Sequence, residues 1–174
     1  NAIALEWGYD AGHDFQEKTR LYRSAGIPYC VCPGTSAWHS ILGRTDNCLT
    51  NIREACEWGL KNDARGVLNT DWGDPHGFYH YQPVSYPGLA YGAALSWGYV
   101  ANVNADVPGL LDTFVFQDAR RRMGQIAYDL GNAYRETGVR LVDWSLLYAF
   151  YPYTLAEIRE RSKIHDDASR AVLH

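Results

Sequence analysis

Residues 66–77, GVLNTDWGDPHG, join an apolar start to a dense polar and aromatic end. If this stretch is a strand, its side chains alternate between two faces, so Asn69 and Asp71 share one face and Trp72 lies on the other. A carboxylate at the buried end of a strand needs a partner or a ligand, and a sugar hydroxyl is one such ligand. The alternative for Asp71 is a salt bridge to Arg44 or another loop arginine. The segment therefore predicts a ligand-binding strand end.

Aromatic residues make up 14% of the chain, with 6 Trp and 13 Tyr. Flat rings stack on the C–H faces of pyranose sugars, so an aromatic excess is expected in a sugar-binding cleft. The same rings also fill cores and interfaces, and packing is the alternative for each of them. The candidate sugar platforms are Trp7, Trp38, Trp72 and Trp97.

Strand-like and helix-like segments alternate through the first half of the chain. This order indicates a parallel sheet covered by helices and predicts the α/β class. Asp14 and Asp46 are the expected N-caps of the first two helices, and Gly26 is the expected stop of the first. Residues 89–97 fit either a strand or a helix turn, and only helices are expected after them. The expected strands are 2–9, 27–34 and 66–71, and the expected helices are 14–25, 47–62, 109–117, 118–137, 141–150 and 154–172.

Polar loops follow all three expected strands. Because the carboxyl ends of parallel strands meet at one edge of a sheet, and barrel enzymes build their sites there, these loops are expected to form one site. Asn69 and Asp71 fit that edge, as do Glu6, Trp7 and Asp10. Glu6 and Asp71 are the only local candidates for a catalytic carboxylate pair.

Charge, hydropathy and cysteine spacing exclude several classes of protein. The net charge of -4, without a basic run, argues against a nucleic-acid surface, and no apolar stretch approaches the ~18 residues of a membrane span. The four cysteines lack the C-x-x-C or paired-His spacing of zinc sites, so they are interpreted as buried thiols in a reducing compartment, with metal binding as the alternative. We therefore expect a cytoplasmic protein without a metal or cofactor, and without a nucleic-acid or membrane partner.

The chain opens inside an apolar strand-like run, NAIALEWGYD, without Met, cap or signal sequence, which indicates the C-terminal part of a longer protein. Two stretches, PGTSAWHSILGRTDN and RGVLNTDWGDPHGFYHYQPVSYPGLAYGAALSW, resemble the C-terminal half of a bacterial family 20 glycoside hydrolase, a β-N-acetylhexosaminidase-like (β/α)8 barrel. The resemblance implies that residues 1–100 hold strands five to eight of a TIM-type catalytic barrel. Residues 101–174 would be a helical tail packed on that barrel.

The resemblance also implies a role for individual residues. Trp7 matches a Trp at the end of strand five, Trp97 matches the aromatic floor on strand eight, and Trp38 is the nearest candidate on strand six. On strand seven the family has Tyr-x-Asp, in which the Tyr binds the acetamido oxygen and the Asp binds sugar hydroxyls. The corresponding tripeptide here is Asn69-Thr70-Asp71, so Asp71 matches and Asn69 replaces the Tyr.

The catalytic Asp-Glu pair of the family follows strand four, and this sequence contains no Asp-Glu dipeptide. The pair is therefore expected upstream, with the Glu as general acid for a substrate-assisted retaining mechanism. This chain would contribute sugar-binding residues, and the missing N-terminal half of the barrel would complete the N-acetylhexosaminide site in cis or in trans. One alternative is a non-catalytic carbohydrate-binding relative, and another is a structural half-barrel that oligomerises through unpaired strand edges.

Overall fold

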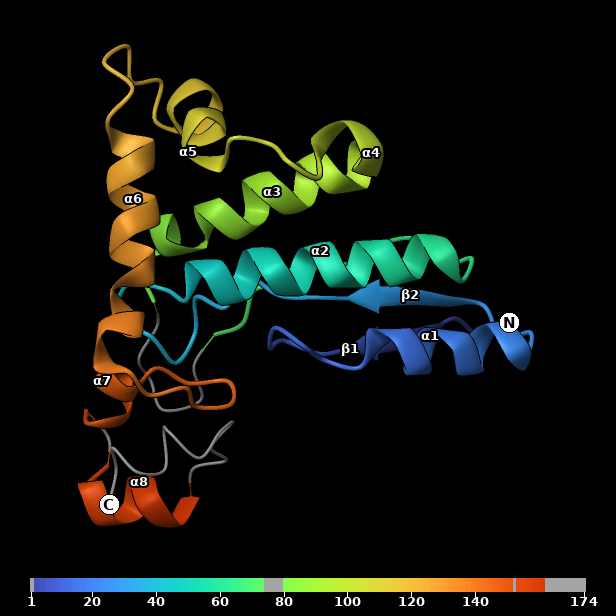
Figure 1. The fold of residues 1–174 in the computed structure, drawn as a ribbon, viewed down its shortest axis with the longest axis horizontal. Coiled ribbons are helices and arrows are strands. Elements are labelled where there is room, and N and C mark those ends of the chain that lie inside the picture. The colour runs from blue at the N-terminus through green and yellow to red at the C-terminus, as the bar shows by residue number, and fades with distance from the viewer. Residues whose placement is uncertain (1, 74–79, 152, 162–174) are drawn as a thin grey trace.

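The computed structural model describes residues 2–73, 80–151 and 153–161, in which helices pack on a small parallel sheet (Figure 1). Short turns of 3-10 helix form η1 (Gln82–Ser85) and η3 (Ala133–Thr137), and a π-helical turn forms η2 (Leu111–Val115). The strands are β1 (Ala4–Trp7) and β2 (Tyr29–Cys32), and the α-helices are α1 (Phe15–Ser24), α2 (Thr45–Lys61), α3 (Tyr86–Trp97), α4 (Tyr99–Asn102), α5 (Val107–Leu110), α6 (Met123–Asn132), α7 (Leu146–Ala149) and α8 (Leu155–Arg161).

The sheet has the parallel order that the sequence predicts. Strand β1 pairs with β2, with Ala4 opposite Tyr29. Residues 66–70 run parallel to β2 on its other side, through bridges at Val31 and Gly34. Because α1 and α2 connect these three segments, the chain begins β-α-β-α-β. The α/β class is confirmed, and no closed barrel forms among the described residues.

The two faces of the sheet differ in burial. Helices α1 and α2 cover one face, where Phe15, Val31 and Ala55 are fully buried. On the other face, the side chains of Leu5 and Leu68 remain 51% and 49% exposed. We call this second surface the open face and define it by Ile3, Leu5, Trp7, Leu68 and Trp72, which are all exposed.

The caps of the first two helices show one correct prediction and one wrong one. Asp14 caps α1 by accepting a hydrogen bond from the amide of Glu17 at 3.1 Å. Asp46, by contrast, lies inside the first turn of α2, which begins at Thr45. Its carboxylate instead accepts hydrogen bonds from Tyr128 and Asn132 of α6, because the tertiary partners outcompete the local cap.

Residues 89–97, which the resemblance assigns to an eighth strand, belong to helix α3. Its small residues allow a close approach: a Cβ added at Gly88 would lie 2.6 Å from the sulfur of Cys48 on α2. Tyr91 and Leu95 are buried in the core between the two helices. The small residues that made this segment ambiguous therefore form the surface with which a helix packs, and the expected strand is wrong.

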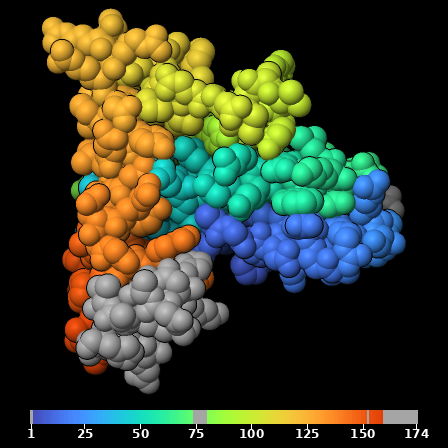
Figure 2. All heavy atoms as spheres, in the orientation of Figure 1, coloured from blue at the N-terminus to red at the C-terminus, as the bar shows by residue number. Residues whose placement is uncertain are grey.

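The second half of the chain contains helices and loops but no named strand within its described ranges. In Figures 1 and 2, α2 (teal) lies between the blue N-terminal β-α-β unit and the yellow-green helices α3 and α4, while α6 (orange) crosses the ends of α2 and α3. The expected helix 118–137 begins only at Met123, the first residue of α6. Before it, the side chain of Asp118 accepts hydrogen bonds from the backbone amides of residues 120, 122 and 123 and so forms a turn. None of the helices in the described ranges has the length and apolarity needed to cross a membrane.

The expected helix 141–150 is helical only over α7. Residues 139–145, which we call the C-terminal loop, return to the carboxyl ends of the strands, where the amide of Ser145 donates to the carbonyl of His39 at 2.9 Å. Of the expected helix 154–172, α8 is described and residues 162–174 lie outside the described ranges.

Candidate functional site

An aromatic groove lies on the open face, at the carboxyl ends of the parallel segments. Tyr9 is at its centre, with ring-centroid distances of 5.6 Å to Trp7, 5.0 Å to Trp38 and 6.1 Å to Trp72. Trp7 and Trp72 are exposed, whereas Trp38 is only 3% exposed and forms the floor. The groove has a volume of about 580 Å³, and its other lining residues are Leu5, Cys32, His39, Leu68, Thr70, Gly73 and Asp143.

The phenol of Tyr9 is held in its protonated form. Burial raises the pKa of Tyr9 above its ordinary value, and hydrogen bonds with Thr70 and Trp72 oppose that rise only in part. The indole of Trp72 also donates to the hydroxyl of Thr70 at 3.1 Å. The centre of the groove therefore offers a neutral ring with a hydroxyl group rather than an anion.

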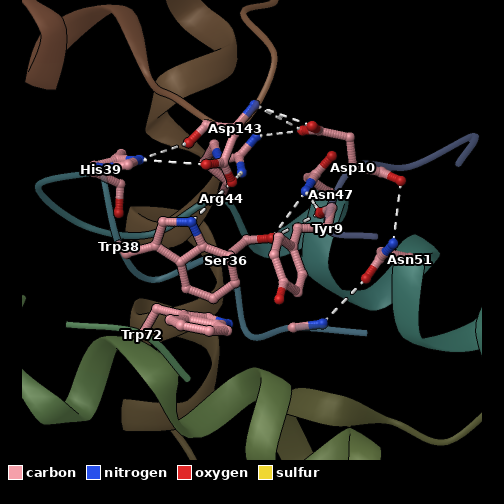
Figure 3. Close-up of polar contacts among 12 residues, drawn as sticks. Tyr9, Asp10, Ser36, Trp38, His39, Arg44, Asn47, Asn51, Trp72 and Asp143 are labelled. Carbon is pink, nitrogen blue, oxygen red and sulfur yellow. Dashed lines mark hydrogen bonds and ion pairs between the residues drawn. The ribbon is translucent and has the colours of Figure 1, made fainter. Parts of the chain in front are cut away.

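Helix α2 fixes the loop that follows β1 through two asparagines (Figure 3). The amide of Asn47 donates to the carbonyl of Tyr9 at 2.8 Å. Asn51 is fully buried, and its amide nitrogen lies 3.0 Å from the carbonyl oxygen of Gly8 and 3.1 Å from that of Asp10. Its side-chain oxygen accepts a hydrogen bond from the backbone amide of Gly34 at 3.2 Å. The ends of β1 and β2 are thus tied to the same helix turn.

A buried ion cluster joins three loops at one end of the groove (Figure 3). Arg44 is 2% exposed, and its guanidinium lies 2.8 Å from the carboxylate of Asp10 and 3.6 Å from that of Asp143. The amide of Asp143 also donates to both carboxylate oxygens of Asp10, at 3.1 and 3.0 Å. The guanidinium thus compensates two carboxylates that come from opposite ends of the sequence.

Asp143 also contacts the residues of the loop after β2. The indole of Trp38 donates to its carboxylate at 2.8 Å, and the imidazole of His39 lies 3.4 Å from its other oxygen. The ring of His39 stacks on Trp144 at 4.1 Å between centroids. Ser36, His39 and Asp143 all have left-handed backbone conformations, which are rare for residues other than glycine and concentrate at functional sites.

Three of the six predicted sugar-binding residues, Trp7, Trp38 and Trp72, meet in the groove. Asn69 and Asp71 lie on the opposite, helix-covered side, so the two residues share one face as expected but do not line this groove. The amide of Asn69 donates to the carbonyl of Gly88 at 3.0 Å.

The partners of Asp71 come from the loop after β2 and from the segment before α3. Its carboxylate accepts hydrogen bonds from Thr35 at 2.5 Å and Ser85 at 2.9 Å, with His80 at 3.3 Å. The predicted alternative, a salt bridge to Arg44, is therefore wrong, since Arg44 pairs with Asp10 and Asp143.

Two other sequence-based candidates also lie away from the groove. Trp97 ends α3 with 92% of its surface exposed and does not line the groove. Glu6 is buried on the helix-covered face, where it pairs with His13 at 3.0 Å, so it forms no catalytic pair with Asp71 in the groove. Asp74 and His76 lie outside the described residues.

Sequence reasoning missed several residues of the site, among them Tyr9, Thr70 and Asp143. Tyr9 carried a usable signal, because it has the same strand parity as Trp7 and directly precedes Asp10. Asp143 carried none, because it lies in a stretch with a helical pattern more than a hundred residues from its partner Trp38.

The groove offers apolar ring faces, one phenol and the partly exposed carboxylate of Asp143. Within the described ranges, no group of three or more His, Cys, Asp or Glu side chains could hold a metal ion. Comparisons with known protein families, with characterised proteins and with solved structures found no match. The groove's own geometry is therefore the basis for a functional proposal.

Proposed function

We propose that the aromatic groove binds carbohydrate, and that the chain supplies sugar-binding residues to the active-site cleft of a β-N-acetylhexosaminidase-like glycoside hydrolase. The observation that carries the proposal is the cluster of Trp7, Tyr9 and Trp72 over the floor residue Trp38, at the carboxyl edge of three parallel segments. Exposed rings of this kind match the C–H faces of pyranose sugars.

The size and lining of the groove support a small polar ligand with apolar faces. A volume of about 580 Å³ falls within the ~300–1,000 Å³ of small-molecule sites. Such sites combine mainly apolar walls with a few polar groups that orient the ligand, and here Tyr9, Thr70 and Asp143 are those groups. Sugar hydroxyls would bond to these groups while the ring stacks on Trp7 or Trp72.

In the barrel proposal, β1, β2 and residues 66–70 would be strands five, six and seven of the family 20 fold. The open face would then point into the barrel, where the N-terminal half would cover it. On strand seven, Trp72 lies on that face, whereas Asn69 and Asp71 lie on the opposite face. The acetamido group would then meet an aromatic residue, as in the family pattern.

The chemistry of hydrolysis would need residues from outside the printed sequence. Among the described residues, no pair of carboxylates lines the groove. The Asp-Glu pair upstream would orient the acetamido group and protonate the leaving oxygen, while the acetamido oxygen attacks the anomeric carbon. The residues of this chain would hold the sugar for that attack.

Two measurements test the proposal. Titration of the chain with N-acetylglucosamine oligosaccharides, at a protein concentration low enough to keep it monomeric, is expected to change its tryptophan fluorescence. Trp72→Ala is expected to weaken binding about tenfold through loss of a stacking ring. Trp97→Ala is the matched control, since Trp97 is exposed away from the groove.

The protein in its full natural length is further expected to release p-nitrophenol from the N-acetylglucosaminide. Binding without release would identify the non-catalytic relative. The absence of both binding and release would refute the carbohydrate proposal.

A second candidate is a structural role in which the sheet associates with another copy of the chain. The open face favours it, because Leu5, Trp7 and Leu68 remain exposed as one apolar surface of the sheet. Exposed apolar sheet surfaces and unpaired strand edges promote association.

A further inference from the structure

We infer that Asp143 is a positioning and specificity residue of the aromatic groove, which selects neutral or amino sugars over sugars that carry a carboxylate. The inference rests on the proposed carbohydrate-binding function. The inference specifies which class of sugar the groove binds, and it gives the C-terminal loop a role in the site.

The first step is the control of ring orientation. Trp38 has one polar atom, its indole N–H, and that group donates to Asp143 at 2.8 Å. The ring of Trp38 meets Tyr9 edge to face, at 5.0 Å and 83°. Gly34 closes the space on another side of Trp38, because a Cβ there would lie 2.3 Å from the indole. Asp143 therefore fixes the floor ring, and the floor ring fixes the central ring Tyr9.

The second step is that Asp143 is itself held in place before any ligand arrives. Its amide donates to both oxygens of Asp10, and Arg44 lies 3.6 Å from the same oxygen that accepts from Trp38. This preorganisation lowers the ordering cost of ligand binding. The side chain of Asp143 is still 33% exposed, and Asp143 is one of the residues that line the groove.

The third step concerns charge. Asp143 is the only Asp or Glu among the lining residues that the structure describes, and their only basic side chain is the imidazole of His39, which pairs with Asp143 itself. Arg44 is buried behind the groove and compensates two carboxylates. A carboxylate accepts hydrogen bonds from hydroxyl or ammonium groups and repels anions. The groove is therefore suited to neutral or amino sugars and unsuited to uronic acids.

Three variants separate the two roles of Asp143. Asp143→Ala removes both the acceptor and the charge, and Asp143→Asn keeps an acceptor oxygen but removes the charge. Trp38→Phe keeps an aromatic ring but removes the N–H donor together with the five-membered ring of the indole. Asp46→Asn is the matched control, because Asp46 also ties the second half of the chain to α2 but contacts Tyr128, Asn132 and Arg135 instead of the groove.

Affinities would be measured by calorimetry with an N-acetylglucosamine trimer, a glucosamine trimer and a glucuronic acid oligomer. Wild type is expected to bind both hexosamine trimers at least about tenfold more tightly than the uronic acid oligomer. Asp143→Ala is expected to weaken binding of the N-acetylated trimer about tenfold, and Trp38→Phe about threefold. Asp143→Asn is expected to bind that trimer within about threefold of wild type while losing the discrimination against uronic acid.

Near-UV circular dichroism of each variant would report whether the aromatic cluster is folded. Asp143→Asn and Trp38→Phe keep the test decisive if Asp143→Ala unfolds. Unchanged discrimination in Asp143→Asn, or unchanged affinity in folded Asp143→Ala and Trp38→Phe, would overturn the inference and leave carbohydrate binding intact. A wild-type chain that binds none of the three oligosaccharides would instead remove the proposed function itself.

Discussion

Arg44 shows at the scale of one residue how the site depends on a buried charge. Its guanidinium is almost completely excluded from water and lies between the carboxylates of Asp10 and Asp143. Removing one partner from a buried ion pair leaves the other charge without compensation, which costs far more than losing an exposed pair. Sequence alone placed Arg44 in a loop but could not identify these two partners.

Substituting Arg44 is therefore expected to destabilise the protein strongly. Arg44→Met retains most of the side-chain volume but leaves two carboxylates facing each other, with an expected loss of about 3 kcal/mol in the free energy of unfolding. Arg20→Met is the control, because the Arg20–Glu17 pair is exposed and screened by water, so its loss should destabilise the protein far less. Urea unfolding would measure both, and similar losses in the two variants would contradict a structural role for the buried cluster.

The cysteines give a second prediction at this scale. Burial raises the pKa of Cys32 to about 11 and that of Cys56 to about 12, and it raises the pKa of Cys48 still further. Since the thiolate is the reactive form, these three thiols stay protonated and unreactive at about pH 8. Cys30 is partly exposed and is expected to react first with iodoacetamide, while the other three should react only after denaturation. Peptide mass spectrometry would identify the labelled thiols, and labelling of native Cys48 would contradict the described packing.

At the scale of elements, α2 organises the site because its first half bonds to the ends of both strands. Asn51 bonds to backbone groups of Gly8, Asp10 and Gly34. A side chain that satisfies three backbone groups through buried or partly buried hydrogen bonds cannot be replaced by an apolar one of similar size without leaving those groups unpaired.

Asn51→Leu is accordingly expected to lower the free energy of unfolding by about 3 kcal/mol. Glu57→Gln on the same helix changes only an exposed pair with Lys61 and should cost about 0.5 kcal/mol or less. Thermal and urea unfolding would compare the two variants. A loss for Asn51→Leu no larger than that of Glu57→Gln would show that the strand ends are held by other contacts.

The elements also show which parts of the fold were predictable. The first two strands and helices follow from local periodicity, and Asp14 and Gly26 mark the limits of α1 because their roles are local. Residues 89–97 could not be assigned, because small residues suit both a strand and a closely packed helix. The side of the sheet on which Asp71 lies could not be predicted, because the alternation of side chains separates two faces without indicating which one the helices cover.

At the scale of the whole molecule, the open face is the side of the sheet that the described helices leave uncovered. Helices cover one side of the sheet, while the apolar residues of the open face are exposed to water. Covering them would be favourable, because apolar surface would be removed from water. In the barrel proposal the N-terminal half provides that cover. In a solution of this chain alone, a second copy presents the same apolar surface, so the open faces of two copies can cover each other.

The 174-residue chain is therefore expected to form dimers or larger species through its open face. Multi-angle light scattering should give a mass above the 19.6 kDa of the single chain, with the share of larger species rising with concentration. Leu5→Lys combined with Leu68→Lys places two charges on the open face and should restore a mass near that of the monomer. Leu60→Lys is the control, because Leu60 is equally apolar and exposed but lies on α2. If the wild-type chain remains a monomer at high concentration, association through the open face is wrong. The open face then stays exposed to solvent in the monomer, and its aromatic groove is accessible to a ligand.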